Sequence, residues 1–179
     1  LTAINFLGVK RLATTNSAAT WWKIAIPLLT ILVLAIANFD STNLTAADGF
    51  NPNGLKGIFA AVPIGGIIFS YLGFEQADQL AGESRNPKRD VPFAIIGSVL
   101  LGTILYILLQ IVFLFALPKS AIGDSWDQVG DGLYTTFTGP FAEIATLLSI
   151  GWLAAIIYAD AIISPGGTGL IYTTGSSRL

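Results

Sequence analysis

Four long apolar stretches constrain the fold of this chain more than any other feature. They occupy residues 21–39, 58–81, 91–117 and 141–174. A helix that crosses a bilayer core about 30 Å thick needs ~20 mostly apolar residues, and each stretch is close to or above that length. Lipid cannot satisfy open backbone groups, and the stretches lack the alternation of barrel strands. The sequence therefore predicts an all-α membrane protein with four transmembrane helices.

The composition agrees with a membrane location and excludes several kinds of function. Of the 179 residues, 53% are hydrophobic and 11% are charged, less than half the share of about 25% that is usual in soluble domains. The formal charge of −2 shows no basic excess, so nucleic acid is not an expected partner. The absence of Cys and His excludes disulfides, haem ligation and His general bases, and we expect no metal and no cofactor.

The start of the chain is unusual for a complete protein. The sequence begins at Leu1 and contains no Met. Residues 1–9 are apolar but too short to span a bilayer, which is typical of the clipped end of a preceding helix. We therefore expect residues 1–179 to be one partial transmembrane domain.

The segments between the apolar stretches alternate in charge. Alternate segments carry the basic residues Lys10, Arg11, Arg85, Lys88, Arg89 and Arg178. The other segments carry only Lys56 and Lys119 among several Asp residues. Because cytoplasmic loops are enriched in Lys and Arg, we expect the first set on the cytoplasmic side of the plasma membrane.

The second apolar stretch contains the clearest departure from a regular helix. Ser70 and Gly73 lie near its middle, after P-I-G-G at 63–66. A helix that unwinds between Ser70 and Gly73 presents bare carbonyls and bare amides, which suit the ammonium and carboxylate of a zwitterion. Glu75 would then lie in the first turn of the second half, where the helix dipole favours an anion. A kinked helix with a closely packed Gly is the other interpretation.

Three further features each have two interpretations. The run S-P-G-G-T-G at 164–169 either ends a helix or loosens it beside an ion or ligand pathway. Lys23 either extends its amine to the membrane interface or keeps it buried, where it can gain and lose a proton. Glu75 and Asp78 share a helix face and either form a paired-acid site or are separate, with Asp78 reaching the membrane interface.

Three polar residues carry weaker signals. Asn43 begins N-L-T, which matches a glycosylation acceptor, although so short a pattern often occurs by chance. Glu143 and Asp160 are expected near the ends of the fourth span, where interfacial water would solvate them.

Residues 69–95 resemble part of the amino acid permeases of the amino acid–polyamine–organocation superfamily. The run F-S-Y-L-G-F-E-Q-A-D-Q-L-A-G-E-S-R-N-P-K-R-D-V-P-F-A-I is similar to the sixth helix of that family and the loop after it. N-F-L-G-V-K at 5–10 resembles the end of the fourth helix, and residues 164–178 resemble the eighth helix in the branch that includes aspartate:proton symporters. The resemblance implies a LeuT-type fold of two inverted repeats, with a discontinuous second span here.

The same resemblance implies roles for individual residues. Substrate binding is expected at the residues that match the sixth-helix break: Phe69, Ser70, Tyr71, Leu72 and Gly73, with the Phe69 ring covering the substrate. Glu75 matches an acidic gate residue, Lys23 the fifth-helix lysine of proton-coupled members, and Tyr172 an aromatic of the substrate pathway.

These features together predict secondary active transport of an amino acid by alternating access, coupled to protons rather than to sodium. The expected partners are the amino acid, the proton, the lipid bilayer and the remaining helices of a full-length transporter. An amino acid exchanger and a non-transporting ligand-binding subunit or sensor on the same scaffold are the alternatives. An enzyme is not expected, because the sequence has no His, no Cys and no nucleophile elbow.

Overall fold

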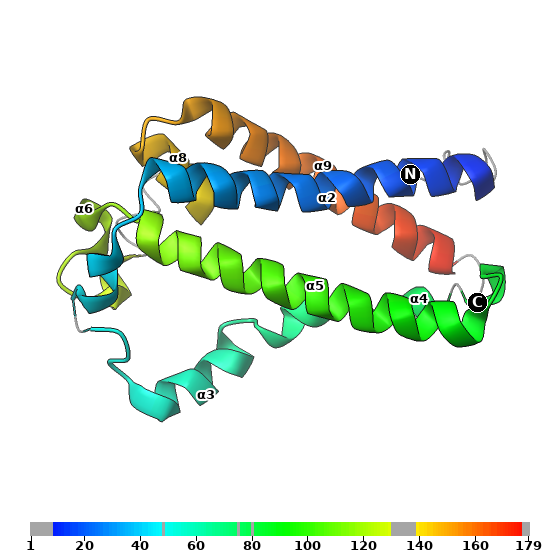
Figure 1. Ribbon diagram of the computed structural model, residues 1–179, viewed down its shortest axis with the longest axis horizontal. Coiled ribbons are helices and arrows are strands. Elements are labelled where there is room, and N and C mark those ends of the chain that lie inside the picture. The colour runs from blue at the N-terminus through cyan, green and yellow to red at the C-terminus, as the bar shows by residue number, and fades with distance from the viewer. Residues whose placement is uncertain (1–8, 48, 75, 80, 130–138, 177–179) are drawn as a thin grey trace.

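Three long helices lying side by side form the body of the protein (Figure 1). The computed structural model describes residues 9–47, 49–74, 76–79, 81–129 and 139–176, and within these ranges it has helices and connecting segments but no strand. The long helices are α2 (Val9–Ala37), α5 (Pro87–Ala116) and α9 (Gly151–Ser176). Their segments Ser17–Ala37, Pro87–Ala116 and Gly151–Thr173 are long and apolar enough to cross a membrane. The predicted all-α fold with helices of membrane-spanning length is confirmed for the described residues, and the number of four spans stays a prediction.

Short helices connect the three long ones. They are η1 (Ser41–Thr45), α3 (Gly54–Ile64), η2 (Ile68–Tyr71), α4 (Gln76–Gln79), η3 (Ala81–Glu83), α6 (Lys119–Ile122), η4 (Trp126–Gln128) and α8 (Pro140–Leu147). The sequence also predicts a short helix around Trp126 to Tyr134; η4 lies at its start, and residues 130–138 lie outside the described residues.

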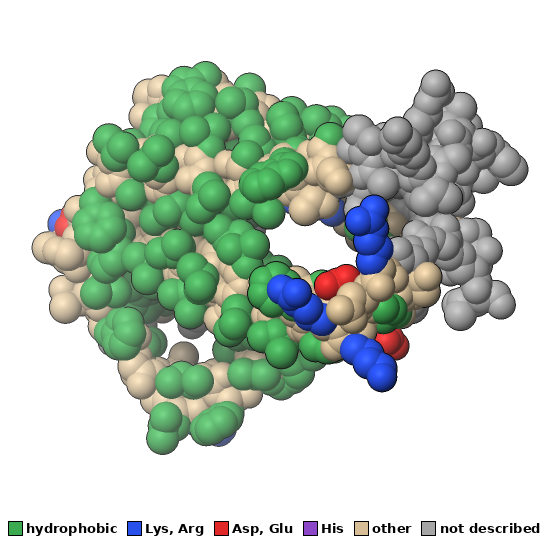
Figure 2. All heavy atoms as spheres, turned by 45° about the vertical axis from the view of Figure 1, so that its right-hand side comes forward, with side chains coloured by type: hydrophobic (Ala, Val, Ile, Leu, Met, Phe, Trp, Pro, Cys, Tyr) green, Lys and Arg blue, Asp and Glu red, His purple; other side chains and the backbone are tan. Residues whose placement is uncertain are grey.

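Most of the apolar surface faces outward. Only 11–17% of the most apolar window in each long segment is buried, and hydrophobic side chains cover most of the face shown in Figure 2. A soluble monomer rarely exposes so much contiguous apolar surface. Lipid or further helices can cover it in a membrane.

The buried core lies at one end of the bundle, where α2 and α5 end and α9 begins. Its fully buried members include Leu34 of α2, Leu117 after α5, Ile144 of α8 and Leu153 of α9. Glu143, in the first turn of α8, is also buried, so the interfacial solvation expected for it is wrong in this structure.

The second predicted span is interrupted, as expected, over a wider region than residues 70–73. Helix α3 ends at Ile64, and irregular backbone with the single turn η2 follows. Helix α3, with 11 residues, is too short to be one of the three candidate membrane spans.

The fourth predicted span is interrupted at a different place from the one expected. Helix α8 ends at Leu147, where Ser149 takes a left-handed conformation with φ of 61°. The amide of Ile150 donates to the Ala145 carbonyl at 2.7 Å and that of Ser149 to the Thr146 carbonyl at 2.9 Å, which is a Schellman helix end. The S-P-G-G-T-G run, expected to end or loosen the helix, stays helical within α9.

The basic segments gather at one end of the bundle. The start of α2, the start of α5 and the end of α9 share this end in Figure 1, and the opposite end holds η1, α6 and η4. Arg85, Lys88 and Arg89 are exposed there, whereas Arg178 lies outside the described residues. The sorting agrees with the charge alternation in the sequence, and the compartment that this end faces stays a prediction.

Asp40 joins the segments at the opposite end. Its carboxylate accepts hydrogen bonds from the Thr42 hydroxyl at 2.6 Å and the Thr42 amide at 2.9 Å, and lies 3.2 Å from the Lys119 amine. The hydrogen bonds from Thr42, aided by Lys119, lower the pKa of Asp40 below its ordinary value.

Asn43 closes the carboxyl-terminal end of α5. Its side chain is fully buried, and its Nδ2 donates to the carbonyls of Leu114 at 2.9 Å and Leu117 at 2.8 Å. The last carbonyls of a helix have no intrahelical partner, so this amide replaces the missing donors. The same nitrogen would carry a glycan, and a bulky glycan has no room here. We therefore interpret Asn43 as a helix-capping residue and not as a glycosylation site.

We expect Asn43→Ala to destabilise the full-length protein by about 1–3 kcal/mol, because two buried carbonyls lose their donor. Thermal unfolding of the purified protein in detergent measures the effect. Asn51→Ala is the matched control, since Asn51 is exposed in a turn. Equal melting temperatures for the two variants would contradict the capping role.

Gly167 allows α2 and α9 to approach closely. A Cβ atom at this position would lie 2.9 Å from the Ala19 Cβ and 3.4 Å from the Lys23 Cε. Small residues at helix crossings in membranes serve this purpose. One glycine of the S-P-G-G-T-G run is therefore explained by packing and not by a break in the helix.

Gly167→Ala should destabilise the full-length protein by about 1–3 kcal/mol, because the new methyl group forces the two helices apart. Gly166→Ala is a control of the same chemistry in the next position. A Cβ at Gly166 meets nothing within 4 Å, so this change should be neutral or stabilise the helix by up to about 1 kcal/mol. Thermal unfolding of both variants tests the difference, and a reversed order would refute the close contact.

Candidate functional site

The backbone between α3 and α4 leaves the helical conformation at two glycines. Gly66 has φ of 74° and Gly73 has φ of 101°, values that L side chains rarely adopt. Between them η2 makes a single turn, and Leu72 is extended with φ of −73° and ψ of 152°. The segment 65–74 therefore has a defined irregular shape that depends on glycine.

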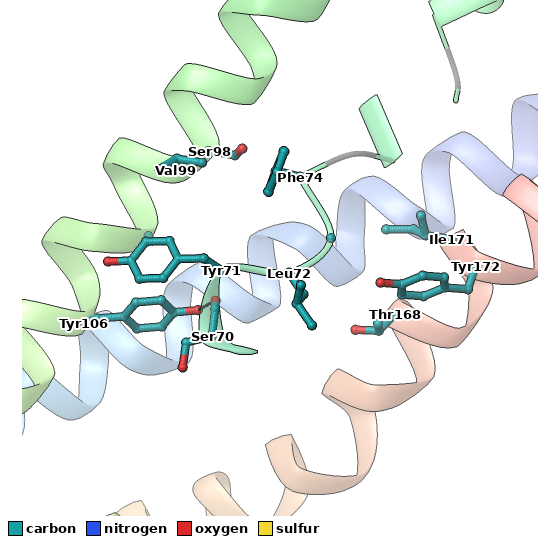
Figure 3. A pocket seen from close by; sticks show the side chains of 12 residues that line it. Ser70, Tyr71, Leu72, Phe74, Ser98, Val99, Tyr106, Thr168, Ile171 and Tyr172 are labelled. Carbon is teal, nitrogen blue, oxygen red and sulfur yellow. Dashed lines mark hydrogen bonds between the residues drawn. The ribbon is translucent and has the colours of Figure 1, made fainter. Parts of the chain in front are cut away.

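Two tyrosines tie this irregular segment to α5. The Tyr106 hydroxyl donates to the Ser70 carbonyl at 2.9 Å (Figure 3). The Tyr71 hydroxyl lies 3.0 Å from the Thr103 Oγ1. The rings of Tyr71 and Tyr106 pack edge to face with centroids 5.7 Å apart. An unpaired carbonyl at membrane depth is costly, so the Tyr106 hydroxyl stabilises the open backbone.

A cavity of about 310 Å³ lies between this segment, α5 and α9. Figure 3 shows residues of α5 on one side and Thr168, Ile171 and Tyr172 of α9 on the other. Its lining comprises Ser70, Tyr71, Leu72, Gly73, Phe74, Ser98, Val99, Gly102, Tyr106, Thr168, Ile171 and Tyr172. The volume lies at the lower end of the range of small-molecule sites, about 300–1,000 Å³, and hydroxyl groups accompany apolar side chains.

The structure brings together most of the residues that the sequence singled out in the second span. Ser70, Tyr71, Leu72 and Gly73 line the cavity, and so does Tyr172 from α9. Phe69 does not line it, and its side chain is 70% exposed, so the ring does not cover the cavity in this structure. Glu75 lies outside the described residues, and its role as a gate stays a prediction.

Sequence reasoning missed the contribution of α5 to this cavity. Ser98, Gly102 and Tyr106 recur every four residues, which places them on one face of the helix. That spacing of small and polar residues within an apolar stretch was the available signal. Without the position of the irregular segment, the same pattern fits ordinary helix packing.

Lys23 lies beside the cavity without lining it. Its Nζ donates a hydrogen bond to the Oγ1 of Thr168, a residue of the cavity wall. The amine is therefore directed toward α9 at the helix crossing. Its proposed exchange of protons is not measured by this geometry and stays a prediction.

Asp160 occupies a different place from the one expected. It is the tenth residue of the 23-residue segment Gly151–Thr173, well away from either end, so the predicted interfacial position is wrong. Its Oδ1 accepts a hydrogen bond from the Trp22 Nε1 at 2.9 Å. Throughout the described ranges no three acidic side chains come together as a metal site.

Comparison with known proteins identifies the family of the chain. The family model described as amino acid permease matches residues 1–179. The chain is 39% identical over 176 residues to the glutamate/serine transporter AimA of Bacillus subtilis (strain 168), covering 98% of this chain and 32% of that protein. The aspartate-proton symporter of the same organism is also 39% identical over 176 residues, covering 98% and 33%.

A plant relative extends the comparison. Cationic amino acid transporter 9, chloroplastic, of Arabidopsis thaliana is 34% identical over 179 residues, covering 100% of this chain and 28% of that protein. The chain spans about a third of the length of these relatives. No solved structure gives a significant match. The apolar helices and the match along the whole sequence agree, and the chain belongs to the amino acid permease family of multi-pass membrane proteins.

Proposed function

We propose that this chain is part of a secondary active transporter that carries an amino acid across the plasma membrane by alternating access, together with protons. The observation that carries the proposal is the cavity of about 310 Å³ beside an interrupted backbone within a bundle of membrane-spanning helices. Non-helical backbone at membrane depth is tolerated where it is buried in protein or lines an aqueous cavity. The names of the relatives, which include an aspartate-proton symporter, support the same activity.

The carbonyls of the irregular segment would receive the substrate ammonium. A carbonyl oxygen has two lone pairs, and the Tyr106 hydroxyl takes one of those on Ser70. The second can accept from an ammonium. In this proposal Phe69 closes over the substrate in another state, Glu75 gates the site, and Tyr172 lines the pathway.

The full-length protein would have a LeuT-type fold, with this chain supplying the end of helix four through helix eight as a partial transmembrane domain. The remaining helices would cover the open sides of the cavity. The basic end, with Lys10, Arg85, Lys88, Arg89 and Arg178, would face the cytoplasm. Glutamate, aspartate and serine occur in the names of the relatives and are the first substrates to test.

We expect Lys23→Ala in the full-length protein to abolish substrate accumulation driven by an imposed pH gradient while leaving substrate counterflow. The reason is that alanine cannot carry the proton, whereas exchange of substrate across the membrane does not require the proton to move. Uptake of labelled amino acid into proteoliposomes measures both. Lys56→Ala, at an exposed position of α3, is the control.

Full gradient-driven accumulation by the Lys23 variant would refute its role in proton coupling. Counterflow without net accumulation in the unmodified protein would instead indicate an exchanger. Saturable binding without any flux would indicate a sensor on the same scaffold.

Tyr106→Phe should raise the KM for substrate by about 2- to 12-fold with little change in kcat, because one hydrogen bond of 0.5–1.5 kcal/mol no longer orients the Ser70 carbonyl. Uptake kinetics of the full-length protein test this. Tyr158→Phe is the matched control, since Tyr158 is exposed on α9 and does not line the cavity. A lower kcat with an unchanged KM would instead point to a purely structural role for Tyr106.

A further inference from the structure

Two adjacent residues of α2 bind two polar residues of α9. The Trp22 Nε1 donates to the Asp160 Oδ1 at 2.9 Å, and the Lys23 Nζ donates to the Thr168 Oγ1. The close approach at Gly167 lies between the two α9 positions. Two polar contacts thus join the helices at their crossing.

Asp160 and Lys23 are charged residues away from the ends of the described spanning segments, whereas Lys88, Arg89 and Asp90 lie in the first turn of Pro87–Ala116. Lys23 is the seventh residue of Ser17–Ala37 and Asp160 the tenth of Gly151–Thr173, and residues 91–116 of α5 contain no Asp, Glu, Lys or Arg. A carboxylate at membrane depth is expensive, and such residues usually pair and serve transport. We therefore expect Asp160 to have a role in transport in addition to its hydrogen-bond partner.

Asp160 is the acidic residue of α9, the helix whose Thr168 binds the Lys23 amine, and it is held there by Trp22, the neighbour of Lys23 in α2. The other elements packed on α9 contribute Glu143, buried in α8, and Asp78, exposed in α4. On α9 itself the remaining titratable groups are Tyr158 and Tyr172. The amine and the carboxylate are thus opposite charges on two helices that meet at this crossing, and each is held by its own hydrogen bond across it.

We propose that Asp160 is the counter-charge of Lys23 and a second residue of the proton-coupling site. The inference rests on the proton-coupled transport proposed above. When the proton is on Lys23, the ammonium balances the carboxylate. When the proton passes to the aqueous phase, the amine is neutral and Asp160 remains charged, with the indole N–H of Trp22 as its donor. That donor does not titrate, so Trp22 serves both states as a positioning residue.

Thr168 connects this pair to the cavity. A protonated amine has donors only, so the Thr168 hydroxyl must accept from it, and the hydroxyl directs its own hydrogen to the Ser164 carbonyl at 3.5 Å. A neutral amine can accept, and the hydroxyl can then donate to it. Because Thr168 lines the cavity, loss of the proton changes the hydrogen bonds that the cavity wall offers to a substrate.

The main test is Asp160→Asn in the full-length protein in proteoliposomes. We expect accumulation driven by a pH gradient to fall about tenfold or more, with counterflow within about twofold of the unmodified protein, because the site loses its charge but keeps its shape. Asp124→Asn, at an exposed position outside the spanning segments, is the control and should retain accumulation.

A stability measurement tests the pairing itself. Lys23→Gln with Asp160→Asn should melt at a higher temperature than Asp160→Asn alone, because the double variant leaves no unpaired charge. Additive losses from the two changes would mean that the groups do not interact, and would overturn the proposal.

The outcomes separate this inference from the function on which it rests. If Asp160→Asn keeps full pH-driven accumulation and Lys23→Ala loses it, the role of Asp160 is overturned. Proton-coupled transport then remains supported. Full coupling in both variants overturns the proton site altogether. If Asp160→Asn does not fold, Trp22→Phe replaces it, because the ring stays and the donor is lost. Reduced accumulation with normal counterflow then supports the proposal, and unchanged accumulation overturns it.

Discussion

The close contact between α2 and α9 is the constraint on which the functional geometry depends. Gly167 has no side chain, so Ala19 can lie against the α9 backbone. That approach allows the Lys23 amine to reach Thr168 and the Trp22 indole to reach Asp160. In lipid no hydrophobic force drives helices together, so close packing and hydrogen bonds of this kind supply the association. The same crossing therefore stabilises the bundle and assembles its charged groups.

The irregular segment is held by a different helix. Gly66 and Gly73 allow the backbone to adopt this conformation. Because glycine also permits many other conformations, the two residues do not hold the segment in this one. Tyr106 and the contact between Tyr71 and Thr103 supply the fixing interactions from α5. A segment that a few hydrogen bonds hold in place can change shape when a ligand takes one of them. This arrangement is better suited to a site that must open and close than a continuous helix would be.

The sequence predicted those features that depend on local chemistry. Hydrophobic length predicted the helices, and the glycines near Ser70 predicted the interruption, because both effects act within a few residues. The features it missed depend on contacts between distant segments. Nothing near Gly167 shows that its missing Cβ faces Ala19, and nothing near Asp160 shows that Trp22 lies opposite. The helix end at Ser149 was missed because its Schellman turn uses a residue other than glycine.

Coupling between ion and substrate requires that each changes the free energy of binding the other. Here Thr168 lines the cavity and also binds the Lys23 amine, so one hydroxyl group belongs to both sites. A hydroxyl has a single hydrogen and can donate in only one direction at a time. In the proposed coupling site the protonation state of Lys23 would therefore limit what Thr168 can offer to a ligand, and a ligand that uses Thr168 would limit what Lys23 can bind. Such direct competition needs no long chain of intermediate residues, and it requires only that α2 and α9 stay in contact.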